Sequence, residues 1–196
     1  MDPTPLIGEP LALDLVNTRG RMASGQEFDL LSTVDDVRRW LSLQSDRLAL
    51  PLDDVDPAAL HPLREAVSEA VQHARRGAPP PQRVLAALSR AQRAAPPHRE
   101  LSWQDDAVVA VLRRSGEATR DVVAQLAEAA ADLLTDPAVR DVRRCEGPAC
   151  EMLFLPAHPR RRWCSPQLCG NRARVARYYR RHKGEDGARP STPEPD

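Results

Sequence analysis

Several features that are typical of enzymes and membrane proteins are missing from this sequence of 196 residues. It contains no stretch of eighteen apolar residues, so no segment is a candidate for a membrane-spanning helix. A Gly-rich phosphate loop, a Gly-x-Ser-x-Gly elbow and a His-Glu-x-x-His motif are absent, and the five histidines are scattered. We therefore predict that the protein is not an enzyme and has no membrane partner.

The sequence also lacks a recognisable secretory signal and contains a single lysine. The first twenty residues contain no basic start followed by an apolar run, which is the pattern of a signal peptide. We therefore expect a cytoplasmic location, where thiols stay reduced. Lys183 is the only lysine among 28 basic residues, so arginine carries almost all of the positive charge.

The net charge of zero conceals a strong asymmetry along the chain. Residues 1–139 hold 15 arginines and 21 acidic residues, a net charge of −6. Residues 140–183 hold 12 basic and 3 acidic residues, a net charge of +9. Such a difference between two parts of a chain indicates that the basic part binds a polyanion.

Residues 1–140 are predicted to form a mainly α domain. Ser32-Thr33 and Asp56-Pro57 are typical helix starts, and apolar residues recur at steps of three and four. The expected helices run through Trp40 and Leu43, from Pro57 to Gly77, from Val84 to Pro96 and from Glu117 to Leu134.

A small β-hairpin is expected between the third and fourth of these helices. Residues 100–103 and 107–112 are separated by Gln104-Asp105-Asp106, which suits a hairpin, although the second run is also compatible with a helix. Asp136-Pro137 ends the last helix and places the domain boundary near residue 140.

All four cysteines lie in the basic part of the chain. Cys145-x4-Cys150 and Cys164-x4-Cys169 are two close pairs separated by thirteen residues, which predicts one structural zinc ion held in a tetrahedron. Disulfides and unrelated buried thiols are the alternatives. His158 lies between the pairs and could replace a ligand, but with four cysteines present we expect it in an exposed loop.

Residues 141–183 are predicted to form a zinc-ribbon or treble-clef-like module, a β-hairpin plus a helix. Residues 152–155 and 160–164 are the expected strands, and a helix is expected to start at Gly170. A segment of this size has too small a core to fold alone, so zinc would supply much of its folding free energy. Residues 184–196 have almost nothing apolar to bury and are predicted to be disordered.

The predicted helix after Cys169 carries Arg174, Arg177, Arg180 and Arg181 within an arc of about 120°. Together with Arg143-Arg144 and residues 160–162, this stripe could neutralise several phosphates of a nucleic acid. The alternatives are a solvated helix face and a docking surface for an acidic protein. The other side of the helix carries Val175, Tyr178, Tyr179 and His182, which we expect to pack in a miniature core with Phe154 and Trp163.

These residues resemble the CGNR zinc finger. The similar residues are Cys145-x4-Cys150, Phe154, residues 159–165, the Cys-Gly-Asn-Arg motif at 169–172 and the arginine-rich helix that follows. The first part is similar to the ABATE domain, through residues 11–18, 63–67 and 129–134. One departure is Glu151, where many relatives have glycine.

The resemblance covers about residues 5–183 and implies a bacterial, stress-related transcription regulator with a zinc-bound end that binds DNA or RNA. It assigns the metal to Cys145, Cys150, Cys164 and Cys169. The candidate nucleic-acid-binding residues are then Arg160, Arg161, Arg162, Asn171, Arg172, Arg174, Arg177, Arg180, Arg181 and Lys183.

The sequence allows several partners for the N-terminal part. Asp14 and Asn17 could line a pocket for a small effector, or could simply cap helices and hold loops. The acidic domain could also bind a protein partner, or bind the finger and limit its access to nucleic acid. Dimerisation through a helix face is a further hypothesis.

Overall fold

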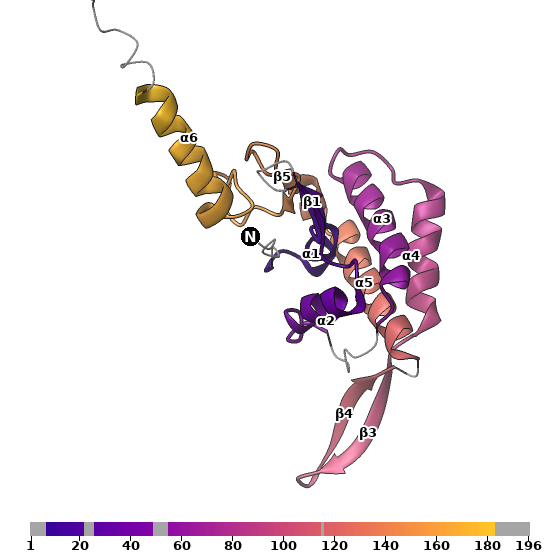
Figure 1. The fold of residues 1–196 in the computed structure, drawn as a ribbon. Coiled ribbons are helices and arrows are strands. Elements are labelled where there is room, and N and C mark those ends of the chain that lie inside the picture. The colour runs from indigo at the N-terminus through magenta and orange to yellow at the C-terminus, as the bar shows by residue number, and fades with distance from the viewer. Residues whose placement is uncertain (1–6, 22–25, 49–54, 115, 183–196) are drawn as a thin grey trace, which may run out of the picture.

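Helices surround the main apolar core of the chain. The computed structural model describes residues 7–21, 26–48, 55–114 and 116–182. Helices α1 (Leu11–Val16), α3 (Pro57–Ala74), α4 (Gln82–Ala94) and α5 (Ala118–Thr135) pack against one another (Figure 1). Helix α2 (Val34–Ser42) adds the buried side chains of Trp40 and Leu41. The predicted mainly α N-terminal domain is confirmed.

Local side chains explain where these helices begin and end. The Thr33 hydroxyl accepts a hydrogen bond from the Asp36 backbone N–H at the start of α2, and the Asp56 carboxylate accepts one from Ala58 at the start of α3. Gly77, with φ of +71°, follows the end of α3, where a residue without Cβ is favoured.

Strands β3 (His98–Gln104) and β4 (Ala107–Arg113) form an antiparallel hairpin that projects away from the helices (Figure 1). Its turn consists of Asp105 and Asp106, whose φ values of 49° and 60° are those of a two-residue type I′ turn. The predicted hairpin is confirmed, and the helical alternative for residues 107–112 is wrong.

A second, shorter pair of strands precedes α2. Strand β1 (Arg19–Arg21) lies antiparallel to β2 (Glu27–Asp29), with Gly20 opposite Phe28. Three-residue strands carry too little alternation to be recognised in a sequence. This pair lies against the finger, because Phe28 packs on the residues around the cysteines.

The zinc module contains a hairpin, but its strands differ from the predicted pair of 152–155 and 160–164. Strand β5 (Arg143–Arg144) pairs with β6 (Leu153–Phe154), and residues 160–163 form no strand. The expected strand at 160–164 is wrong for a physical reason. The edge of β6 that it would join is already occupied, since Asn17 bonds to the backbone of Leu153 and Glu9 bonds to the backbone N–H of Leu155.

The finger and the helical domain share their apolar cores. Leu153 of β6 belongs to the main core, whereas Phe28 of the N-terminal domain packs in the finger. Helix α6 (Asn171–His182) starts beside the cysteines and extends away from the rest of the protein (Figure 1). The predicted helix after Cys169 is confirmed. Lys183 and the predicted disordered tail, 184–196, lie outside the described residues.

Within the ranges that the structure describes, no helix combines the length and apolar character needed to traverse a bilayer.

Candidate metal centre and basic helix

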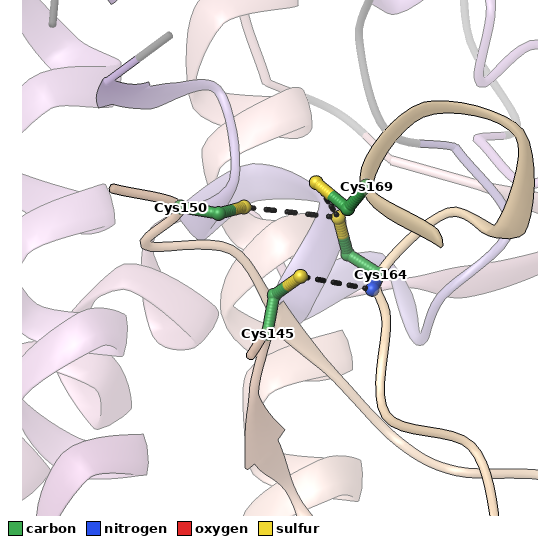
Figure 2. A group of neighbouring side chains, drawn as sticks. All are labelled: Cys145, Cys150, Cys164 and Cys169. Atoms are coloured by element: carbon green, nitrogen blue, oxygen red, sulfur yellow. Dashed lines mark hydrogen bonds between the residues drawn. The ribbon is translucent and has the colours of Figure 1, made fainter. Parts of the chain in front are cut away.

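Three separate stretches of backbone bring the four cysteines together. Cys145 follows β5 and Cys150 precedes β6, so the first pair occupies the turn of this hairpin. Cys164 lies at the end of the loop that follows β6. Cys169 lies in the turn of π-helix at Pro166–Gly170, immediately before α6. Figure 2 shows the four sulfur atoms pointing toward one another.

The spacing of the sulfur atoms fits a tetrahedral zinc site. All four Sγ atoms lie within 4.8 Å of one another, with Cys150 Sγ 3.8 Å and Cys169 Sγ 3.6 Å from Cys164 Sγ. Thiolates at about 2.3 Å from a tetrahedral zinc ion are about 3.8 Å apart. These separations are far longer than a disulfide bond of about 2.05 Å, and all four cysteines are free. The residues therefore fit one structural zinc ion.

Two backbone amides donate hydrogen bonds to the sulfur atom of Cys145. The N–H groups of Gly147 and Cys164 donate to Cys145 Sγ at 3.4 and 3.3 Å. Gly147 has no side chain to obstruct this turn, and a Cβ there would lie 3.1 Å from Cys169 Sγ. Met152 and Phe154 are buried beside the cysteines, so the site is shielded from water on that side.

Hydrogen bonds among the four thiols make their pKa values unequal. Hydrogen bonding from Cys150 is the largest cause that lowers the pKa of the Cys145 thiol. The neighbouring Cys145 is the largest cause that raises the pKa of Cys164, and it also leads the causes that raise the pKa of Cys169. Four thiolates this close together need a divalent cation to compensate their charge.

The helical body and the closed four-thiolate site define a two-part protein, an α domain with a C-terminal zinc finger. A comparison with protein families agrees with this division. The model of the ABATE family, described as "Putative stress-induced transcription regulator", matches residues 9–137, and the CGNR zinc finger matches residues 142–182. The chain therefore belongs to the ABATE family and carries a CGNR zinc finger. A search of curated proteins found no match.

Arg161 is engaged inside the protein, whereas the other candidate arginines whose side chains the structure describes are exposed. Its guanidinium donates to the buried Glu9 carboxylate at 2.5 Å and to the Cys164 carbonyl at 2.7 Å, and it stacks 4.5 Å from the Phe154 ring centroid. These contacts join the N-terminal segment to the cysteine loop. We therefore assign Arg161 a structural role and leave it out of the candidate nucleic-acid surface.

Asn17 and Glu9 pair with the backbone of the finger, and no local sequence signal marks either residue for this role. The Asn17 side-chain amide donates to the Leu153 carbonyl and accepts from the Leu153 N–H, both at 2.8 Å. A Glu9 oxygen accepts from the Leu155 N–H at 2.9 Å. The two side chains continue the sheet at the outer edge of β6, and they fix the finger on the helical domain.

The described arginines of α6 lie on an exposed face of that helix. Arg174, Arg177 and Arg181 are exposed, as are Asn171 and Arg172 at its start. The side chain of Arg180 and the whole of Lys183 lie outside the described part of the chain. We use the name arginine face for Arg174, Arg177 and Arg181.

A hollow of about 240 Å³ adjoins the arginine face. Arg162, Trp163, Gly170, Arg174 and Arg177 are among its lining residues, so one tryptophan and three arginines border the same depression. Arg162 also pairs with Glu146 at 2.7 Å, and its guanidinium lies 5.2 Å from the Trp163 ring centroid. Arg160 is exposed in the preceding loop, beside the exposed His158.

The prediction that the aromatic side of α6 is a core is wrong. Tyr178 and Tyr179 are 58% and 66% exposed, and Val175 is exposed as well. The helix extends away from the body, so no described element covers this side (Figure 1). Tyr178 stacks instead on His182, with ring centroids 4.0 Å apart. Phe154 is fully buried, as predicted.

The hypothesis that Asp14 lines an effector pocket is also wrong. Its carboxylate is buried and accepts hydrogen bonds from the N–H groups of Gly8 and Glu9 and from Arg47 at 2.6 Å. Burial is the largest influence on the pKa of Asp14 and raises it, against the lowering effect of these donors. Asp14 therefore holds the N-terminal loop in place.

Asn17, by contrast, does line an open cleft, between the helical domain and the finger. The cleft has a volume of about 450 Å³ and is bordered by α3, β1 and the finger. Its arginines are Arg19, Arg64, Arg75, Arg76 and Arg144, and its acids are Glu27, Glu65 and Glu151. The α6 helix lies outside this junction, so the acidic domain does not cover the arginine face.

We predict that the protein binds one zinc ion per chain and that Cys164→Ser abolishes this binding. The variant should lose most of the finger's stability, since zinc contributes roughly 10–16 kcal/mol in small finger peptides. Elemental analysis of the reduced protein and urea unfolding would measure both effects. As a control, His158→Ala should retain full zinc content, because His158 is not among the clustered ligands. Metal-free protein that keeps an ordered finger would contradict the prediction.

We predict that Asn17→Ala lowers the free energy of unfolding by about 2–4 kcal/mol, because two buried backbone groups of Leu153 lose their partners. Urea denaturation would measure the change. The only other asparagine, Asn171, is exposed, so Asn171→Ala should cost less than about 0.5 kcal/mol. Equal effects of the two substitutions would show that Asn17 does not fix the finger.

Proposed function

We propose that this chain is a cytoplasmic bacterial transcription regulator whose zinc finger binds DNA or RNA through α6. The observation that carries the proposal is the exposure of the arginine face on a helix that extends away from the body. Arginine forms paired hydrogen bonds with phosphate and with guanine edges, so such a face suits a nucleic acid. The family description as a stress-induced transcription regulator supports the same function.

The exposed aromatic residues of α6 strengthen this proposal. Tyr178 and Tyr179 are accessible next to the arginine face, and Trp163 contributes to the adjoining hollow. Aromatic rings stack on bases while guanidinium groups bind the phosphates, a combination typical of single-stranded binding. Arg160 and Arg162 extend the positive surface on the finger side of α6.

We propose a purely structural role for the zinc ion, and no enzymatic activity. Four thiolates complete the tetrahedral coordination, so no position remains for a water or substrate. Reduced, clustered thiols of this kind fit a cytoplasmic protein.

We predict that replacing Arg174, Arg177 and Arg181 by alanine weakens nucleic-acid binding at least about tenfold. The dependence of log K on log salt should become shallower by about 3, since each lost phosphate contact removes roughly one unit of slope. Fluorescence anisotropy with labelled DNA and RNA over a series of salt concentrations would measure both. The matched control replaces Arg90, Arg93 and Arg120, which are exposed on the helical domain, and should change neither quantity.

Unchanged binding by the α6 variant would overturn the assignment of this helix. If the purified protein binds no nucleic acid but retains an acidic protein through the arginine face after nuclease treatment, the finger is a protein-interaction module.

We also propose that the cleft between the domains binds a small anionic effector. Burial is the largest cause that lowers the pKa of Arg75. The nearby positive charges of Arg76 and Arg144 lower it further. A carboxylate or phosphate group would relieve this repulsion. Because its walls come from both the helical domain and the finger, an occupant would contact both.

We predict that inorganic phosphate binds this cleft saturably at constant ionic strength and shifts the amide resonances of Gly20 and Leu153, which line it. The double substitution Arg75→Ala and Arg76→Ala should weaken binding about tenfold or more, because two of the clustered charges are lost. Replacing Arg90 and Arg93, outside the cleft, should have no effect. If phosphate fails to bind while the double variant loses affinity for nucleic acid, the cleft belongs to the nucleic-acid surface instead.

A further inference from the structure

One face of the β3–β4 hairpin is apolar and exposed. Residues directly opposite each other in an antiparallel pair share a face, and the pairs on this one are Arg99 with Leu112, Leu101 with Ala110, and Trp103 with Val108. Leu101 and Trp103 are each 67% exposed, Val108 is 64% exposed and Leu112 is 54% exposed. We call these six residues the hairpin face.

The hairpin face is as large as the largest apolar patch of a typical monomeric protein, and patches of this size are often functional. At roughly 150–250 Å² for a fully exposed large side chain, its four large apolar residues present on the order of 400–500 Å² to water. A two-stranded hairpin is also only marginally stable when it stands alone in water. Both considerations indicate that another surface covers this face.

The opposite face of the hairpin differs in character. It carries Glu100 and Arg113, which form an ion pair at 3.0 Å, and its other members are His98, Ser102, Gln104, Ala107, Val109 and Val111. Val111 is its exposed large apolar residue, at 41%. The contrast between the two faces shows which of them is suited to association.

We infer that the hairpin face associates with the same face of a second copy of this chain, around a two-fold axis. Two such faces in contact would bury on the order of 1,000 Å² in total, which is the lower limit for a specific interface. A two-fold contact is self-complementary, so one apolar patch per chain is sufficient. The association does not depend on the proposed nucleic-acid binding.

The distribution of charge along the hairpin fixes the orientation of the two copies. The tip carries the exposed Asp105 and Asp106, whereas Arg99 lies at the opposite end of the hairpin face. In an antiparallel arrangement the tip of each copy meets the partner's Arg99, and two pairs of opposite charges form. Trp103 then lies over the same guanidinium group, where a cation–π contact is favourable.

The centre of the face also suits this arrangement. Leu101 and Ala110 lie opposite each other in the middle of the hairpin face, so a two-fold axis at this level places Leu101 of one copy against Leu101 of the other and makes the centre of the contact apolar. The two aspartates at the tip would repel a nucleic acid or an anionic membrane, which makes a protein the fitting partner.

Sedimentation of the full, zinc-loaded chain would test the inference, over concentrations up to about 200 μM. We expect a monomer–dimer equilibrium that Leu101→Glu weakens at least about tenfold, since each copy would place a charge in an apolar contact. The matched control Val111→Glu makes the same change on the opposite face and should leave the equilibrium unchanged. Far-ultraviolet circular dichroism would confirm that both variants remain folded.

A charge reversal tests the orientation without altering the apolar residues. Arg99→Asp should weaken the dimer, and combining it with Asp105→Arg and Asp106→Arg should restore most of the affinity. A wild-type chain that remains monomeric, or one that loses association equally in Leu101→Glu and Val111→Glu, would overturn the proposal. Failure of the reversed charges to restore binding would overturn the antiparallel arrangement.

Discussion

Repulsion among four thiolates, and its compensation by one cation, is the constraint on which the finger depends. The finger places three separate stretches of backbone around the sulfur atoms, with strands of only two residues to hold them. Its apolar residues are few, chiefly Met152, Phe154 and Trp163. Such a core cannot offset the entropy lost on ordering the chain, so the metal must contribute directly to folding. The start of α6 is consequently set by the position of Cys169.

The helical domain stabilises the part of the finger that metal coordination does not hold, the free edge of β6. Metal coordination alone would leave one edge of β6 with unpaired backbone groups, which are costly when buried. Asn17 and Glu9 pair with that edge from the N-terminal domain, and Arg161 neutralises Glu9 from the finger side. The arginines of the finger thus differ in their environment. Arg161 faces a buried carboxylate and holds the domains together, whereas the arginine face has been left accessible.

Much of this arrangement could be predicted from the sequence, because its signals are local. Each cysteine pair is separated by four residues, and the Asp105-Asp106 turn and the apolar run after it define the hairpin within a short segment. The docking of the finger depends instead on contacts between residues 136 and 146 positions apart in the chain. No local pattern distinguishes an asparagine that pairs with a distant strand from one that ends a helix. The sequence of α6 likewise does not show whether another element covers its aromatic side, so it predicts a core for Tyr178 and Tyr179, which are exposed.

The hairpin and α6 leave the body at different ends, and this separation matters for how the parts could act together (Figure 1). A two-fold contact through the hairpin leaves both arginine faces accessible, because neither helix takes part in it. Two fingers related by symmetry would read two half-sites, so the spacing of those sites would follow from the rigid body between hairpin and finger. The shared core and the Asn17–Leu153 pairing supply that rigidity. An anion bound in the cleft would contact both the helical domain and the finger, and it would therefore influence the orientation of the finger on which this spacing depends.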